Sequence, residues 1–81
     1  MYEPTMTFSA ADENESEMKE NLTEVYNALK EKGYNPTNQL VGYILSEDPT
    51  YITTYRNART IMGRIDRDDL LAAMIEYFVN H

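Results

Sequence analysis

The sequence has no cysteine, no tryptophan, and only three glycines and three prolines among its 81 residues. Without cysteine the chain can form neither a disulfide framework nor a thiolate metal site, which fits a reducing compartment. Its uninterrupted apolar runs are only a few residues long, whereas a membrane-spanning helix needs roughly 18 residues. Residues 1–15 lack the basic and apolar regions of a signal peptide. We therefore expect a cytoplasmic protein without membrane insertion.

Basic residues are also scarce, with 7 lysines and arginines against 14 acidic residues and a formal net charge of −7. Nucleic-acid binding is therefore not expected, because neutralising phosphates requires a basic surface. The charge is uneven: acids crowd residues 1–24, whereas residues 55–65 contain only the bases Arg56, Arg59 and Arg64. The two segments could attract each other within one chain or between two chains.

The spacing of apolar residues predicts helices. A first helix is expected over about residues 15–32, and Gly33 stands where a left-handed cap would end it. A second helix is expected over about 36–46 and a third over about 54–65, after a TYITTY stretch that is extended or frayed. The expected inward face of the first helix consists of Met18, Leu22, Val25, Tyr26 and Leu29.

The last helix is expected to begin at Asp66, whose side chain can cap it. Its expected inner face consists of Leu70, Leu71, Met74, Ile75 and Phe78. A chain of this length allows only one domain. We predict an all-α protein, a small bundle of about four helices over residues 14–81, preceded by a flexible N-terminal tail over residues 1–13.

The stretch KGYNPTNQLVGYILSEDPTYI, residues 32–52, is interpreted as the corner of the fold, with Asn35 and Pro36 starting a helix. Gly42 lies inside that short helix, where glycine costs about 1 kcal/mol against alanine. This favours close approach by another helix, and so small a core favours oligomerisation. We therefore predict a homodimer whose interface includes Val41, Gly42, Tyr43, Ile44 and Leu45.

No arrangement of residues indicates catalysis, a metal site or a cofactor. The single histidine, His81, is terminal, and the sequence has no phosphate-binding glycine loop or nucleophile elbow. Helix capping explains Asp66, Asp68 and Asp69 more simply than a cation site, because an EF-hand needs a regular 12-residue loop. We predict that the protein is not an enzyme and has no catalytic residue, no metal ligand and no cofactor.

Two groups of side chains leave alternatives open. Arg56 and Arg59 share a helix face and could bind a phosphate or carboxylate, although pairing with the acidic first helix is the favoured interpretation. The tyrosines at 34, 43, 51 and 55 could stack on bases but are favoured as core or interface anchors. The runner-up function is a helix-turn-helix-like nucleic-acid binder whose third helix presents arginines, which the net charge disfavours.

Residues 22–59, LTEVYNALKEKGYNPTNQLVGYILSEDPTYITTYRNAR, resemble the IreB-like family of small proteins of Gram-positive bacteria. The resemblance is densest in KGYNP, NQLVGYILS, DPTYI and NAR, and continues more loosely through the last helix. It implies a small helical homodimer without established enzymatic activity. It also implies a substrate of a transmembrane Ser/Thr kinase with extracellular PASTA domains and of its cognate phosphatase.

The resemblance further implies phosphorylation in the N-terminal tail and negative regulation of cell-envelope stress and cephalosporin-resistance signalling. The family's tail has a threonine three positions before a phenylalanine, and Thr5 occupies that position relative to Phe8. We carry Thr5 over directly and take the neighbouring Thr7 as a second candidate. The implied partners are the kinase, the phosphatase, a second copy and a downstream protein that the sequence does not identify.

Overall fold

Every regular element in the described part of the chain is a helix. The computed structural model describes the backbone of residues 4–81 and the side chains of residues 15–81. Four α-helices, α1 (Pro4–Glu31), α2 (Pro36–Ser46), α3 (Ala58–Gly63) and α4 (Arg67–Val79), are joined by two 3-10 turns, η1 (Pro49–Tyr51) and η2 (Tyr55–Asn57). This confirms the predicted all-α class with about four helices. The division into a tail and a helical domain stays a prediction.

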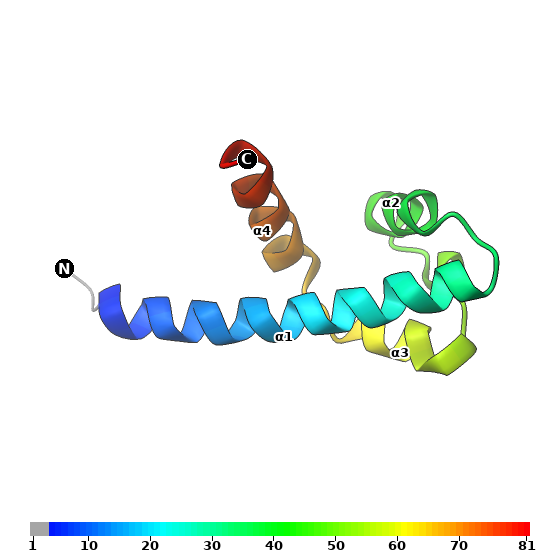
Figure 1. Cartoon of the computed structure of the whole chain (residues 1–81), viewed down its shortest axis with the longest axis horizontal. Helices are drawn as coiled ribbons and strands as arrows, with labels where there is room; N and C mark the ends of the chain where they lie inside the picture. The colour runs from blue at the N-terminus through cyan, green and yellow to red at the C-terminus, as the bar shows by residue number, and fades with distance from the viewer. Residues whose placement is uncertain (1–3) are drawn as a thin grey trace.

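The other elements are arranged along the long helix α1 (Figure 1). In this view α2 crosses α1 near its C-terminal end, and α3 lies along the opposite side of α1. Helix α4 rises from the middle of α1 on the same side as α2, and beyond its first turn it stands away from both. The fold is therefore a packed body of α1, α2 and α3 with α4 as a projecting arm.

Helix α1 begins earlier than predicted and ends as predicted. It starts at Pro4 instead of about residue 15. At its other end Gly33 adopts the expected left-handed conformation, with a φ of 89°. The N–H of Tyr34 donates to the carbonyl of Leu29 at 3.0 Å, and the N–H of Gly33 to that of Lys30 at 3.0 Å. This pair of bonds is a Schellman motif, which satisfies the last carbonyls and turns the chain toward α2.

The corner predicted between residues 32 and 52 is present. The side chain of Asn35 accepts a hydrogen bond from the N–H of Asn38 at 3.0 Å, and Pro36 occupies the first turn of α2. Asp48 caps η1 in the same way, accepting from the N–H of Thr50 at 3.0 Å. These two caps explain why a segment rich in turn residues forms two short helical pieces.

The third helix is shorter than the predicted span of about 54–65. Arg56 and Asn57 adopt left-handed conformations, with φ of 55° and 62°. Two consecutive residues in this region cannot continue an α-helix, because their carbonyls no longer point along its axis. The segment therefore forms the turn η2 first, and α3 starts only at Ala58.

The buried core lies on the α3 side of α1 and at the junctions with its neighbours. Its buried members are Val25, Ala28, Leu29, Ile52, Ala58, Met62, Ile65 and Leu70. Met18 and Leu22, predicted to face inward, are only partly buried at its edge, and Tyr26 is exposed. The prediction for α4 is wrong in one respect: of its expected inner face only Leu70 is buried. Beyond its first turn α4 projects from the packed body, which leaves the other four side chains 37–82 % exposed.

Candidate interaction surface

Helix α4 leaves the body of the protein after its first turn. The carboxylate of Asp66 caps it by accepting from the N–H of Asp69 at 3.1 Å, as the sequence predicted. Leu70, which is 2 % exposed, anchors the helix in the core. Beyond it the apolar side chains are open, with Ile75 62 % and Phe78 82 % exposed. The exposed apolar side chains of α4, which we call the arm face, are Leu71, Met74, Ile75, Tyr77, Phe78 and Val79.

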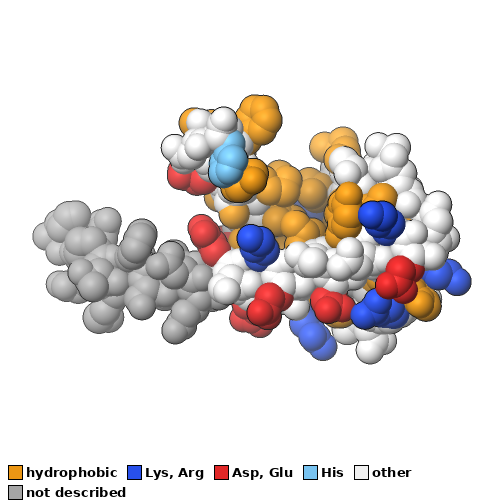
Figure 2. Space-filling model, in the orientation of Figure 1, with side chains coloured by type: hydrophobic (Ala, Val, Ile, Leu, Met, Phe, Trp, Pro, Cys, Tyr) orange, Lys and Arg blue, Asp and Glu red, His pale blue; other side chains and the backbone are white. Residues whose placement is uncertain are grey.

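A hollow between α4 and α2, above α1, is lined by hydrophobic side chains (Figure 2). On α2, Val41 is 48 % and Leu45 81 % exposed, and they lie one helical turn apart on one face. Contiguous apolar surface of this kind is uncommon on soluble monomers and marks sites of association. We call this hollow the apolar groove.

The predicted interface residues of α2 fall into two groups. Val41 and Leu45 are exposed, whereas Tyr43 and Ile44 are partly buried against the core of the same chain. Their place in a dimer interface stays a prediction. The reason given for Gly42 is wrong, however. A Cβ atom at Gly42 would lie 2.6 Å from Cδ1 of Tyr51, so the close approach that requires glycine is made by a ring of the same chain.

One arginine ties the arm to the body. Nη1 of Arg67, at the start of α4, donates to the carbonyl oxygen of Ile44 at 3.2 Å, and Nη2 lies 2.8 Å from a carboxylate oxygen of Glu47. The side chain is 31 % exposed. It thus satisfies a carbonyl in the last turn of α2 and fixes the direction in which α4 leaves. Sequence reasoning missed Arg67, because nothing in the spacing shows that the start of α4 meets the end of α2.

The structure places Arg56 and Arg59 in different roles. Nη1 of Arg56 lies 2.8 Å from Glu31 and Nη2 lies 3.7 Å from Glu24, both on α1. Nε of Arg59 donates to the backbone carbonyl of Ile52 at 2.9 Å. The favoured pairing with the acidic first helix is therefore present for Arg56. Binding of an external anion by the two arginines stays a prediction, and such an anion would compete with Glu31.

The tyrosines named in the sequence contact the protein itself. The hydroxyl of Tyr55 donates to Glu31 at 3.0 Å, and this bond together with the Glu31 charge raises the pKa of Tyr55. Tyr51 covers Gly42, Tyr43 packs against the core, and Tyr34 is about half exposed at the corner between α1 and α2. For Tyr43 and Tyr51 these contacts support the interpretation as packing anchors.

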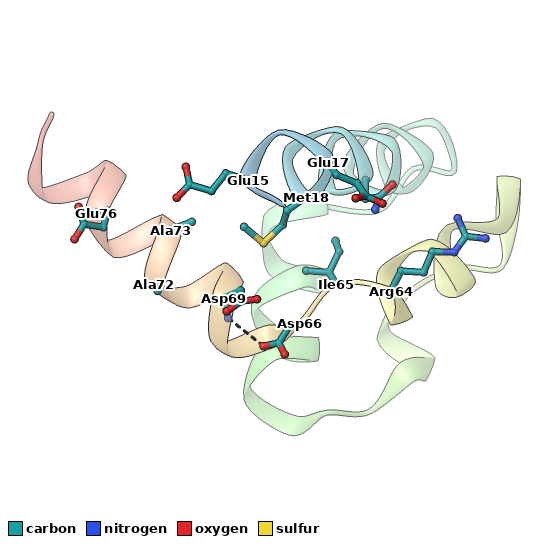
Figure 3. Close-up of a pocket in the computed structure, with 11 residues that line it drawn as sticks. Glu15, Glu17, Met18, Arg64, Ile65, Asp66, Asp69, Ala72, Ala73 and Glu76 are labelled. Carbon is teal, nitrogen blue, oxygen red and sulfur yellow. Dashed lines mark hydrogen bonds between the residues drawn. The ribbon is translucent and has the colours of Figure 1, made fainter. Parts of the chain in front are cut away.

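A second hollow, of about 390 Å³, separates α4 from α1. Figure 3 shows carboxylates from both helices around it, with Met18 and Ile65 on its apolar floor. Its charged lining consists of Glu15, Glu17, Asp66, Asp69 and Glu76 against the one base Arg64. Like charges on facing helices repel, which favours the open angle between α1 and α4. In the part of the chain with described side chains, no group of three residues could hold a metal ion.

The helix-turn-helix alternative loses its structural basis. Its recognition helix would be α3, which has only six residues, Ala58–Gly63. Arg56 and Arg59, two of the side chains expected to face a groove, bind acceptors within the chain. None of the described helices is long and apolar enough to cross a membrane. The candidate phosphorylation sites Thr5 and Thr7 lie outside the residues whose side chains are described.

Comparison with known proteins supports the resemblance seen in the sequence. Residues 3–80 match a family model described as the IreB regulatory phosphoprotein. The chain is also similar to a protein named UPF0297 from Ruminiclostridium cellulolyticum, with 58 % identity over 78 residues. That similarity covers 95 % of this chain and 89 % of the relative. Both matches span the N-terminal threonines, the helical body and the arm.

Proposed function

We propose that this chain, which belongs to the IreB family of regulatory phosphoproteins, acts as a non-catalytic regulator switched by phosphorylation of its N-terminal threonines. The observation that carries the proposal is the family match over residues 3–80, since it includes Thr5 and Thr7 as well as the helical body. The structure adds a surface suited to protein association, formed by the arm face and the apolar groove.

The modifying partners in this proposal are a transmembrane Ser/Thr kinase with PASTA domains and its cognate phosphatase, acting on the protein in the cytoplasm. A phosphate adds about −1.5 to −2 charges at pH 7. The nearest described part of α1 is already acidic, with Glu15, Glu17 and Glu20 in little more than one turn. Phosphorylation of Thr5 therefore adds negative charge N-terminal to an already acidic stretch, and in this proposal the added charge alters the binding of other proteins.

The regulatory output in this proposal is negative control of cell-envelope stress and cephalosporin-resistance signalling, through a downstream protein. We propose that the chain acts as a homodimer. The exposure of the arm face supports this, because a contiguous set of exposed apolar side chains, such as Phe78 and its neighbours, marks a site of association.

Phosphorylation by a purified PASTA-domain kinase from the same genome tests this proposal. Mass-spectrometric mapping is expected to find phosphate on Thr5, with Thr7 as a second site, and the cognate phosphatase is expected to remove it. A Thr5→Ala variant is expected to lose most of the incorporated phosphate, and Thr60→Ala, which changes an exposed threonine of α3, serves as the matched control. Phosphate found only in the helical body would contradict the proposal.

A further inference from the structure

We propose that the hollow of about 390 Å³ between α1 and α4 is a docking site for a basic, amphipathic helix of another protein. We call it the α1–α4 hollow. The inference rests on the proposed function and deepens it, because it assigns a surface for the downstream protein and the chemistry of the segment that binds there. The side chains of α4 that line the hollow lie on the opposite side of the helix from Leu71, Ile75 and Phe78, so the site is separate from the arm face.

The floor of the α1–α4 hollow is apolar. Met18 of α1 and Ile65, which precedes α4, form it, and Ile65 is 7 % exposed (Figure 3). On the α4 wall, Ala72 and Ala73 present only methyl groups, so the backbone of an approaching helix can come close to α4. The volume falls in the range of roughly 300–1,000 Å³ typical of binding pockets. The hollow can therefore accept the side chains of one inserted face.

The carboxylates around this floor are regularly spaced. Asp69 and Glu76 lie seven residues apart on α4, which is two helical turns or about 10 Å along the axis. The two alanines lie between them on the same face. Glu15 and Glu17 line the opposite wall, on α1. Negative charge thus surrounds an apolar centre, with acids on both helices.

The chain has no cations in place to neutralise these carboxylates. The ion pairs among the described side chains use other acids, namely Glu24, Glu31 and Glu47. Residues 1–14 contain no lysine or arginine. Arg64 is the one basic residue of the lining, and Figure 3 shows it at the opposite end of the hollow from Glu76. The positive charge that complements this surface therefore has to come from a partner.

The charge and the apolar floor together define that partner. Nucleic acids, phosphorylated segments and anionic membranes are repelled by the rim carboxylates. A helix with lysine or arginine at two positions seven residues apart matches the spacing of Asp69 and Glu76. Apolar side chains in the turn between those positions then contact Met18 and Ile65, as in other complexes of an amphipathic helix in a groove. The stems of lysine and arginine add to this contact, because they pack on apolar surface while their charged ends stay at the rim.

The first experiment selects binding peptides from a displayed library of helical peptides. The full-length, unphosphorylated chain is immobilised, and an excess of the Glu17→Gln, Glu76→Gln double variant is added in solution. This competitor removes every peptide that binds elsewhere on the protein. The peptides that remain bound are expected to carry lysine or arginine two helical turns apart, with leucine, isoleucine or methionine between them.

The second experiment measures the affinity of one selected peptide by fluorescence anisotropy. The double variant is expected to bind about fivefold more weakly or worse, because two ion pairs are lost. The matched control is Glu20→Gln with Asp68→Asn, which removes the same charge from the same two helices outside the hollow. Its affinity is expected to stay within about twofold of the wild-type value. Added salt is expected to weaken wild-type binding more than binding by the double variant, and circular dichroism checks that both variants keep their helices.

Three results would overturn the inference. One is a selection from which no basic peptide remains. Another is equal weakening by the double variant and the control, which would mean that only the overall negative charge attracts the peptide. The third is tighter binding of spermidine than of any selected peptide, which would make the hollow a polyamine site. All binding is measured on the unphosphorylated chain, whereas the kinase assay measures modification of Thr5, so failure here is distinguishable from failure of the proposed function.

Discussion

At the scale of single residues, Gly42 is explained by an intramolecular contact. The ring of Tyr51 occupies the space that a Cβ atom at Gly42 would need. The side chain of Gln39, also on α2, donates a hydrogen bond to the backbone carbonyl of Tyr51 at 2.9 Å and so holds Tyr51 against α2. The sequence correctly indicated a close approach at Gly42 but could not show which group approaches, since Tyr51 is brought there by the turns at Asp48 and Pro49.

Gly42→Ala tests this contact. It is expected to destabilise the protein by about 1–3 kcal/mol, as overpacking does, even though alanine is the better helix former. Gly63→Ala is the control, because nothing lies within 4 Å of its added Cβ, and it is expected to be neutral or slightly stabilising. Urea unfolding measures both. Equal stability of the two variants would show that Tyr51 moves away freely.

Asp48 makes a pH-dependent contribution to stability. Its carboxylate accepts hydrogen bonds from the Thr50 hydroxyl at 2.7 Å and the Thr50 N–H at 3.0 Å, and these bonds lower the pKa of Asp48. A carboxyl whose folded-state pKa is depressed stabilises the fold above its unfolded pKa of about 3.9. That contribution is lost as the pH falls through the lower, folded-state pKa.

Asp48→Asn is therefore expected to be less stable than the wild-type chain near neutral pH, with a difference that shrinks as the pH falls below about 4. Urea unfolding of both proteins between about pH 6 and pH 3 measures the difference in their free energies of unfolding. The contributions of the other carboxylates are nearly the same in both proteins and largely cancel in this difference. A difference that stays constant over this range would mean that ionised Asp48 adds nothing to the cap.

At the scale of elements, the sequence predicted helices where capping and periodicity agree. The end of α1 at Gly33, the start of α2 at Asn35 and the cap of α4 at Asp66 all follow from local chemistry. The predicted start of α3 was wrong, because no feature of the sequence indicates the left-handed conformation of Arg56. It is held by tertiary contacts, the pairing of its guanidinium with Glu31 and Glu24.

A comparison of Arg56→Gly with Arg56→Ala isolates this backbone conformation, since both variants lose the ion pairs. At a left-handed position glycine is expected to be more stable than alanine by about 1–2 kcal/mol. Inside an ordinary helix the order is reversed, by about 1 kcal/mol. Thermal or urea unfolding measures the difference in stability between the two variants, and its sign shows whether residue 56 is left-handed or helical. An alanine variant more stable than the glycine variant would contradict the structure.

At the scale of the whole molecule, the sequence predicted that α4 has one apolar side but did not predict what surrounds that side. The spacing of Leu70, Leu71, Met74, Ile75 and Phe78 correctly marks one apolar side, yet only Leu70 finds the core of its own chain. Periodicity shows that a face must be covered but not which molecule covers it. The same limit applies to Arg67, whose partners Ile44 and Glu47 come from an element that the sequence does not place beside it.

The central claim is that this protein works by being modified and bound, as a regulator and not as a catalyst. The most direct measurement is the intact mass of the protein purified from the cells that make it, before and after exposure to a cephalosporin, with the modified site mapped. We expect a phosphorylated form, modified at Thr5, whose share changes with the antibiotic. A single unmodified mass under both conditions, with the kinase present and active, would contradict the claim.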